Sequence, residues 1–215
     1  MTNIKLHHTV RAAMVSDSLD TLGIRNNVMS PDIRPLERTM KITGFAATIE
    51  FIEGSDFDPK DPYALAIDYL DTLQPGEVAV VSTGQSLKSA FWGELFSTAA
   101  LMRGATGVIS DGPLRDVNEI FEVGFNAFGV SALPYDYKGR MKVANTRSEV
   151  ICGGVKVAPG DFIIADIDGV VVVPKAVINE VFTSANARAL GENQVLIDLK
   201  AGSTVREAWD KHHLL

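Results

Sequence analysis

The sequence predicts one α/β domain followed by a helical C-terminal extension. Between residues 42 and 130, apolar runs typical of strands alternate with segments whose apolar residues recur at helical spacing. From residue 149 the pattern changes to short apolar strands joined by tight turns, and a long helical pattern follows Pro174. The chain has 215 residues, of which 46% are hydrophobic, so it can bury a core without disulfides or metals.

The first part of the chain predicts two helices and two strands. A helix is expected over residues 6–22, a strand over 42–52, a second helix from Asp61-Pro62 to about residue 73, and a strand over 77–82. The first helix is predicted from apolar residues near helical spacing and a glycine after them: Leu6, Val10, Met14, Leu22 and Gly23.

The middle of the chain predicts two further helix–strand units. A helix over residues 89–103, with Gly104 at its C-terminal cap position, leads into a strand over 106–110. A short helix over residues 118–123 and a strand over 127–130 follow. This alternation of helices and strands points to an α/β domain.

Short strands dominate the next segment. We expect strands over residues 150–157, 162–165 and 170–173, the last two joined by a hairpin turn at Asp168-Gly169.

A helix is predicted after Pro174, over residues 175–190, and the polar tail beyond Gly191 is expected to be partly helical. No linker separates domains. We therefore expect a single domain over residues 1–215, with a core over about residues 10–175 and a helical extension over about 175–215.

The composition excludes several classes of protein. The net charge is −7 and no basic block offsets it, so no nucleic-acid partner is expected. No apolar run approaches the ~20 residues of a membrane span, so no membrane partner is expected, and the first residues lack the apolar segment of a secretory signal. The single cysteine, Cys152, cannot form an internal disulfide. We therefore expect a cytoplasmic protein.

Charged residues between positions 93 and 116 are the strongest candidates for a binding site. Gly93 and Glu94 fall in the first turn of a predicted helix, where free backbone N–H groups favour an anion. Asp111, Arg115 and Asp116 follow a predicted strand, at the end where ligands bind in α/β sheets. Arginine can grip a carboxylate and aspartate can ligate a hard cation, although an Arg-Asp pair in a loop is more often a solvated surface pair.

The stretch WGELFSTAALMRGATGVISDGPLRD, residues 92–116, resembles the signature of the RraA-like family. That family includes 4-hydroxy-4-methyl-2-oxoglutarate aldolases and related oxaloacetate decarboxylases. Four shorter motifs occur in the family's order, and the resemblance covers roughly residues 10–190. These motifs are SDSLD at 16–20, GFAAT at 44–48, GGVKVAPGD at 153–161 and DIDGV at 166–170.

This resemblance implies an α-β-β-α sandwich similar to a swivelling phosphohistidine domain. It also implies a class II, divalent-metal-dependent lyase that cleaves 4-hydroxy-2-oxo acids, of the 4-hydroxy-4-methyl-2-oxoglutarate type, to pyruvate and also decarboxylates oxaloacetate. Both reactions generate the pyruvate enolate, whose charge the metal ion stabilises. The implied small-molecule partner is a 2-oxo acid, and the implied assembly is a homotrimer or hexamer.

The resemblance also assigns roles to residues. Family aldolases carry an acidic residue, twenty intervening residues and Arg-Asp, which here are Glu94, residues 95–114 and Arg115-Asp116. Glu94 departs from the aspartate that is more frequent at its position. Arg115 is expected to contact the pyruvate unit, and Asp116 to hold Mg²⁺ or Mn²⁺, partly through water. The substrate carboxylate is expected to bind backbone amides of Gly93, Glu94, Leu95 and Phe96.

Two residues are candidates for holding the general base. A water molecule held by Glu94 or by Asp17 would remove the proton of the 4-hydroxyl group. The resemblance adds Glu192, from a neighbouring subunit's C-terminal helix, as an acidic residue near the site, with a plain surface carboxylate as the alternative.

A different function is the main alternative. The founding family member is a non-catalytic regulator that binds and inhibits ribonuclease E. Such regulators are shorter at the C-terminus and depart from the acidic–Arg–Asp pattern. This chain has both the C-terminal extension and the acidic–Arg–Asp pattern. The sequence therefore favours the enzyme.

Overall fold

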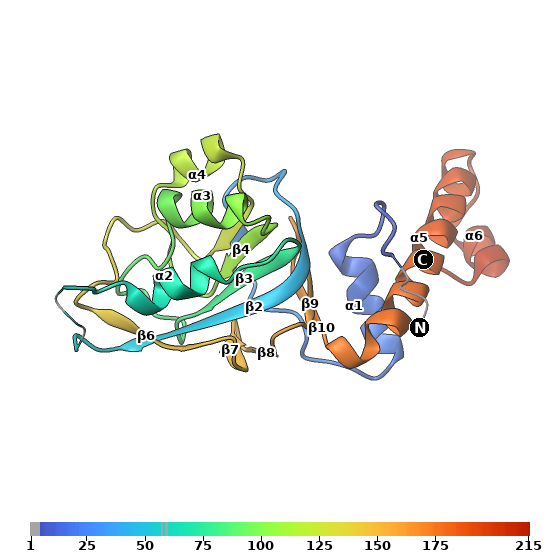
Figure 1. Cartoon of the computed structure of the whole chain (residues 1–215). Coiled ribbons are helices and arrows are strands. Elements are labelled where there is room, and N and C mark those ends of the chain that lie inside the picture. The colour runs from blue at the N-terminus through green and yellow to red at the C-terminus, as the bar shows by residue number, and fades with distance from the viewer. Residues whose placement is uncertain (1–4, 57, 59) are drawn as a thin grey trace.

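The computed structural model describes residues 5–56, 58 and 60–215 and confirms a mixed α/β fold (Figure 1). The strands are β1 (Arg34–Pro35), β2 (Ile42–Glu53), β3 (Glu77–Ser82), β4 (Gly107–Ser110), β5 (Ala127–Gly129), β6 (Met141–Thr146), β7 (Val150–Cys152), β8 (Val155–Val157), β9 (Phe162–Asp166) and β10 (Gly169–Val173). The helices are α1 (Ala12–Thr21), α2 (Ala64–Asp71), α3 (Glu94–Met102), α4 (Val117–Val123), α5 (Ile178–Lys200) and α6 (Val205–His212), with a 3₁₀ turn at Lys175–Val177.

One large sheet organises the molecule, with strand order β1-β5-β4-β3-β2-β9-β10 and β6 paired to β2. Strands β2, β3, β4 and β5 are parallel, so their carboxyl ends meet at one edge of the sheet. Strands β9 and β10 return antiparallel and, with the β7–β8 hairpin, give the sheet a nearly closed, barrel-like form.

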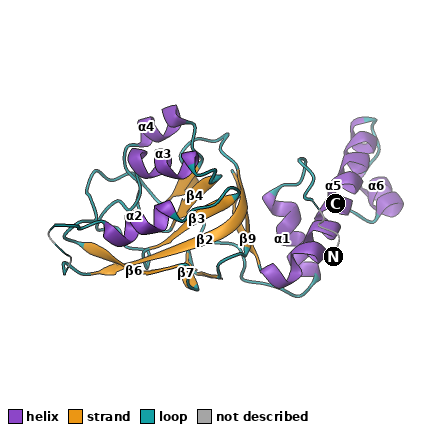
Figure 2. Cartoon of the chain, viewed as in Figure 1, coloured by secondary structure: helices purple, strands orange, loops and turns teal. Residues whose placement is uncertain are grey.

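Alternating side chains divide the interior into three apolar cores. Ala79 and Val81 of β3 face a first core under α2, α3 and α4, whereas Val78 and Val80 face a second core shared with β7–β10. A third core lies between β9–β10 and the helices α1 and α5. Helices therefore cover both outer sides of the two strand layers, as Figure 2 shows, which is the expected α-β-β-α architecture.

Several predicted boundaries were wrong at the helices. The helix expected over residues 6–22 begins only at Ala12, because Arg11 is extended with φ −114° and ψ 163°. The helix expected from Asp61-Pro62 begins at Ala64. The helix expected to end near residue 190 continues through Gly191 to Lys200, and a separate helix, α6, follows it. In the described part of the chain, no helix is both long and apolar enough to cross a membrane.

The strands differ in three places. The strand expected over residues 150–157 is a hairpin, because Gly153 and Gly154 adopt φ values of 55° and 80° and reverse the chain. The short strand β1 was not predicted. Strand β6 was not predicted either. Half of its residues are polar, and it pairs only with β2 and is incompletely covered.

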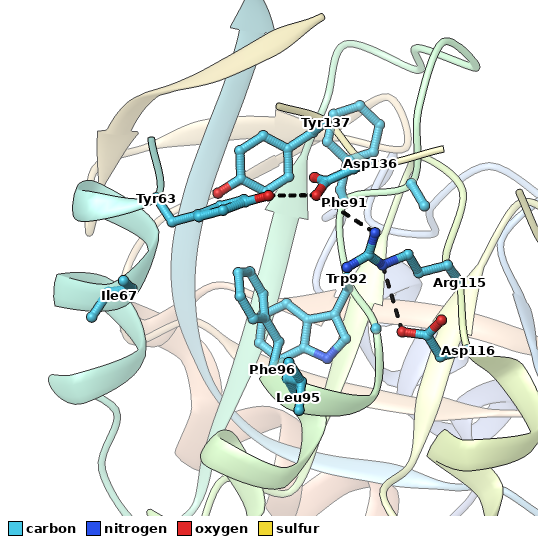
Figure 3. Close-up of a pocket in the computed structure, with 12 residues that line it drawn as sticks. Tyr63, Ile67, Phe91, Trp92, Leu95, Phe96, Arg115, Asp116, Asp136 and Tyr137 are labelled. Atoms are coloured by element: carbon cyan, nitrogen blue, oxygen red, sulfur yellow. Dashed lines mark hydrogen bonds and ion pairs between the residues drawn. The ribbon is translucent and has the colours of Figure 1, made fainter. Parts of the chain in front are cut away.

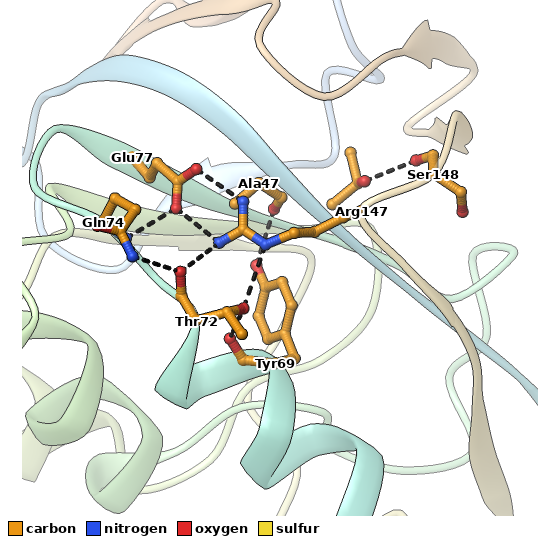
Figure 4. Close-up of polar contacts among 8 residues, drawn as sticks. Ala47, Tyr69, Thr72, Gln74, Glu77, Arg147 and Ser148 are labelled. Atoms are coloured by element: carbon orange, nitrogen blue, oxygen red, sulfur yellow. Dashed lines mark hydrogen bonds and ion pairs between the residues drawn. The ribbon is translucent and has the colours of Figure 1, made fainter.

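Arg147 ties the loop between β6 and β7 to the turn between α2 and β3 (Figure 4). Its guanidinium donates to both carboxylate oxygens of Glu77 at 2.8 and 2.9 Å, and to the Thr72 carbonyl at 2.7 Å. Burial raises the pKa of the Glu77 carboxyl, but the hydrogen bonds from Arg147 and from the Gln74 N–H, together with the charge of Arg147, outweigh burial and hold this pKa below its usual value. The pair lies at the start of β3, at the opposite end from the parallel strands' carboxyl edge.

Candidate active site

A cavity of about 250 Å³ lies where the loops after β4 and β5 meet the start of α3 (Figure 3). Two acidic side chains and one basic side chain gather at one side of it, and aromatic or aliphatic side chains form most of the rest. Its lining residues are Tyr63, Ile67, Ala90, Phe91, Trp92, Gly93, Leu95, Phe96, Arg115, Asp116, Asp136 and Tyr137.

Backbone hydrogen bonds hold the segment before α3 in an extended form. The Ala90 N–H donates to the Tyr135 carbonyl at 2.8 Å, and the Phe91 N–H donates to the Pro113 carbonyl at 3.1 Å. The Arg115 N–H in turn donates to the Trp92 carbonyl at 2.9 Å. These bonds explain why the helix predicted from residue 89 begins only at Glu94, since residues 90–92 are bound to two loops instead.

Arg115 lies between two carboxylates. Its Nε lies 3.5 Å from Asp116 Oδ2, and its Nη1 lies 3.6 Å from Asp136 Oδ2. The arginine side chain is 36% exposed and that of Asp136 is 30% exposed, so the group is partly withdrawn from solvent but open to a ligand. A guanidinium held this way presents its remaining donors to an anion in the cavity.

Tyr63 extends this polar group from helix α2. Its hydroxyl donates to Asp136 Oδ2 at 2.5 Å. Burial, together with this hydrogen bond, raises the pKa of Tyr63 to about 12. The phenol therefore stays protonated at neutral pH and remains a donor to the carboxylate.

Asp116 has an unusual backbone conformation at the start of α4. Its φ is 55° and its ψ 45°, in the left-handed region that aspartate tolerates better than most residues. Its Oδ2 accepts a hydrogen bond from the Glu94 N–H at 3.3 Å. A Cβ atom at Gly93 would lie 2.5 Å from this oxygen, so the site requires glycine at that position.

Aromatic packing fixes the apolar side of the cavity. The Trp92 indole N–H donates to Ser97 Oγ at 2.9 Å, and its ring stacks on Phe125 with centroids 6.4 Å apart. Phe96 meets Trp92 edge-on at 5.5 Å. The indole is therefore a rigid wall from which Phe96 extends into the cavity.

The structure brings most of the predicted binding residues together. Arg115 and Asp116 line the cavity, as do Gly93, Leu95 and Phe96. Glu94 contributes its backbone N–H to Asp116, but its side chain is not part of the lining.

Asp111 does not line this cavity, although it follows the strand end where the sequence predicts a ligand site. Its Oδ1 accepts from the Thr83 N–H at 2.7 Å and from the Thr83 hydroxyl at 2.8 Å, and its Oδ2 accepts from the Gly153 N–H at 3.1 Å. Burial raises the pKa of the Asp111 carboxyl despite these bonds. This residue ties the loops after β3 and β4 to the β7–β8 turn.

Asp17 and Glu192 lie together in the α1–α5 layer and not among the lining residues of their own chain's cavity. Arg188 joins them, with Nη2 2.8 Å from Asp17 Oδ2 and Nε 3.0 Å from Glu192 Oε1. Glu192 also accepts from Arg11 at 2.7 Å. A role for either carboxylate in a neighbouring copy's site stays a prediction.

The sequence did not predict four of the lining residues: Tyr63, Ile67, Asp136 and Tyr137. Asp136 carried a usable signal, because it follows β5 just as Arg115 follows β4, and both strands end at the same edge. Tyr63 carried no such signal. It lies directly before helix α2, and no local spacing in the sequence reveals that it contacts this loop.

The carboxylates present fit a hydrated divalent cation better than a protein-enclosed one. Among the described residues, no three His, Cys, Asp or Glu side chains cluster closely enough to bind a metal ion. Asp116 offers a carboxylate oxygen, Oδ1, beside the start of α3, while its Oδ2 is already hydrogen-bonded. Mg²⁺ commonly binds through one or two carboxylates, with water and substrate oxygens completing its octahedron, so this donor set suits it.

The family of the chain follows from a match over three-quarters of its length. A family model described as RraA-like, Aldolase/RraA, matches residues 12–172. The chain belongs to the RraA-like family. The match includes the loops that carry Arg115, Asp116 and Asp136.

Two similar proteins are one named DlpA and one named for an aldolase activity. The RraA-like chain is 31% identical over 201 residues to protein DlpA of Legionella pneumophila, a match that covers 92% of this chain but only 31% of DlpA. It is 27% identical over 182 residues to a protein of Halalkalibacterium halodurans provisionally named a 4-hydroxy-4-methyl-2-oxoglutarate aldolase, covering 84% of this chain and 80% of the relative.

Solved structures share the fold of this RraA-like chain. Streptomyces coelicolor RraAS2, described as an unusual member of the RNase ES inhibitor RraA protein family, superposes with a TM-score of 0.79 at 28% identity, over 88% of this chain and 93% of RraAS2. An uncharacterised Pseudomonas syringae protein gives a TM-score of 0.81 at 26% identity, over 93% and 92%.

Proposed function

We propose that this RraA-like chain is a divalent-metal-dependent lyase that releases pyruvate from 4-hydroxy-2-oxo acids and decarboxylates oxaloacetate. The observation that carries the proposal is the convergence of Arg115, Asp116 and the N-terminus of α3 on one cavity. Relatives named as 4-hydroxy-4-methyl-2-oxoglutarate aldolases support the same reading.

The start of α3 would bind the substrate carboxylate. The Ser97 N–H makes the first helical hydrogen bond, to the Gly93 carbonyl at 3.0 Å. The N–H groups of Leu95 and Phe96 precede that bond and have no partner within the helix. Together with the positive end of the helix dipole, they suit a carboxylate.

Arg115 would neutralise the charge that develops on the 2-oxo oxygen. Bond cleavage leaves an electron pair on the pyruvate fragment, and delocalisation onto that oxygen makes it an enolate. A guanidinium already in position stabilises this charge more strongly than it stabilises the neutral ketone. A divalent cation held by Asp116 would add positive charge at the same oxygen.

The proton of the 4-hydroxyl group needs an acceptor. Glu94 remains a candidate within the chain, acting through water. Asp17, also acting through water, and Glu192 would have to come from a neighbouring copy, because neither lines its own chain's cavity. We therefore also propose a homotrimer or hexamer, in which a neighbouring copy can supply such a residue. The sequence leads us to propose a cytoplasmic location.

A pyruvate-release assay tests the proposal. Purified protein with Mg²⁺ is expected to turn over oxaloacetate well above the rate with Mg²⁺ alone. A matched variant, Arg206→Lys on α6, serves as a control because its side chain is 77% exposed and lies outside the cavity. Turnover no faster than with the metal alone, on oxaloacetate and on 4-hydroxy-2-oxo acids, would refute the activity.

The fold shared with RraAS2 favours one second candidate, a regulator that binds ribonuclease E. Calorimetric titration of ribonuclease E with the purified chain separates the two functions. Micromolar binding without turnover would establish the regulator instead of the lyase.

A further inference from the structure

We propose that the cavity selects 4-hydroxy-2-oxo acids that carry an aromatic or other apolar group at C4, in preference to those with a second carboxylate there. This inference rests on the proposed lyase activity and concerns only the part of the substrate that becomes the carbonyl product. It follows from the charges and the apolar surface that line the cavity.

The charges leave one carboxylate site. Among the described residues that line the cavity, Arg115 is the only basic one, and Asp116 and Asp136 face it. The pyruvate unit would use Arg115 and the start of α3. A second carboxylate would then meet two protein carboxylates and aromatic rings, and burying an unpaired charge is costly.

Lys138, a cation beside the Tyr63 ring, faces elsewhere. Lys138 Nζ lies 5.9 Å from the centroid of the Tyr63 ring. This lysine lines a neighbouring hollow beyond α2 and is not among the residues that line the cavity. The Tyr63 ring, lining both spaces, separates the ammonium group from the substrate.

The side of the cavity away from Asp116 is apolar. Figure 3 shows Ile67 on α2 across the cavity from Arg115 and Asp116, with Phe96 and Trp92 between them. Ile67 is 47% exposed and Leu95 is 75% exposed, so the apolar surface continues to the cavity mouth. A cavity of about 150 Å³ can hold benzene, so one of about 250 Å³ has room for a phenyl group beside the pyruvate unit.

The reaction expected with an aryl substrate is a retro-aldol cleavage. In 4-hydroxy-2-oxo-4-phenylbutanoate the C3–C4 bond breaks, and its electron pair remains on C3 as the pyruvate enolate. The 4-hydroxyl group loses its proton and becomes the carbonyl of benzaldehyde. Protonation of C3 then gives pyruvate, so no oxidant, reductant or additional reactant is needed.

Two substrates test the preference. With Mg²⁺ present, coupled pyruvate release gives kcat/KM for 4-hydroxy-2-oxo-4-phenylbutanoate and for 4-hydroxy-4-methyl-2-oxoglutarate. We expect the aryl substrate to be favoured by about tenfold or more, the size of effect that an unpaired charge produces. Equal values, or a preference for the dicarboxylate, would overturn the inference.

A third measurement keeps this test separate from that of the lyase itself. Exchange of the pyruvate methyl protons in D₂O, followed by NMR, reports enolate formation without any C4 substituent. Exchange without the aryl preference would overturn the inference alone. Absence of both exchange and turnover would overturn the proposed function and, with it, this inference.

Two variants provide a matched comparison, one with a charge on the apolar side of the cavity and one with the same charge outside it. Ile67→Arg places a cation on the lining, whereas Leu65→Arg places one on the same helix outside it. Both parent side chains are about half exposed, so both variants should fold, which circular dichroism checks. Ile67→Arg is expected to shift the substrate ratio toward the dicarboxylate by about tenfold. An equal shift in Leu65→Arg, or no shift in Ile67→Arg, would count against the proposal.

Discussion

Arg115 and Asp136 follow two neighbouring parallel strands and meet with Nη1 3.6 Å from Oδ2. The hydroxyl of Tyr63 binds the same carboxylate oxygen, so helix α2 and the two loops share one polar contact. This contact fixes the arginine on which the proposed chemistry depends.

Arg115→Lys should retain the fold and lose most of the activity. Lysine keeps the positive charge but lacks the planar fork that can reach a carboxylate or an enolate oxygen with two donors. Removing one such donor from a developing oxyanion costs about 10²–10³ in kcat. Steady-state kinetics with oxaloacetate measure the effect. If Arg115 were only a surface partner of its two aspartates, kcat would stay within a few-fold of the parent.

Gly93→Ala should disturb the site without changing the backbone. Gly93 has an extended backbone, with φ −151° and ψ −165°, that alanine also adopts. The added methyl group would lie 2.5 Å from Asp116 Oδ2 and 3.0 Å from Arg115 Cγ, so both side chains must move. Displacements of about 1 Å can cost about 100-fold in rate. Arg206→Lys is again the control, because its side chain is exposed and outside the cavity. A parent-like rate for Gly93→Ala would contradict the geometry.

Metal removal should abolish pyruvate release. Asp116 can supply one carboxylate oxygen to a cation, and a single protein ligand leaves the metal exchangeable. Dialysis against EDTA is therefore expected to remove activity, and added Mg²⁺ or Mn²⁺ to restore it. Asp116→Asn should weaken the response to added metal. Full turnover after exhaustive chelation, verified by elemental analysis, would exclude the metal-dependent reaction.

Glu77→Gln should destabilise the fold at neutral pH and have little effect in acid. Because the pKa of Glu77 is lowered in the folded state, its ion pair with Arg147 stabilises the protein fully above the unfolded pKa of about 4.3. This stabilisation disappears as the pH falls through the lower, folded value. We expect a loss of about 1–3 kcal/mol in the free energy of unfolding at pH 7. Urea unfolding at pH 7 and pH 3 measures it, and an equal loss at both would contradict this account.

The sequence predicted elements best where burial follows a simple period. The apolar runs of β3, β9 and β10 are buried on both faces, so their composition alone marks them as strands. Strand β6 was not predicted because an incompletely covered strand needs no apolar pattern. The predicted start of α3 was wrong because distant loops compete for the backbone of residues 90–92, and no local propensity carries that information.

The candidate site was predictable only where it is local in sequence. Gly93, Arg115 and Asp116 were found because helix starts and strand ends are recognisable positions. Tyr63 and Asp136 meet through tertiary packing between segments far apart in the chain, and a single sequence gives no measure of that distance. The same limit applies to Asp17 and Glu192, whose contact through Arg188 became visible only in three dimensions.

Strand β9 is enclosed on all four sides, which has a consequence for how the molecule opens. Its two edges pair with β2 and β10, Ile163 faces one core, and Ile164 faces another. No partial opening can release its amides without separating the α1–α5 layer from the sheet that carries the cavity. Hydrogen exchange in β9 should therefore proceed only by global unfolding, so that the C-terminal helices and the loops that line the cavity belong to one cooperative unit.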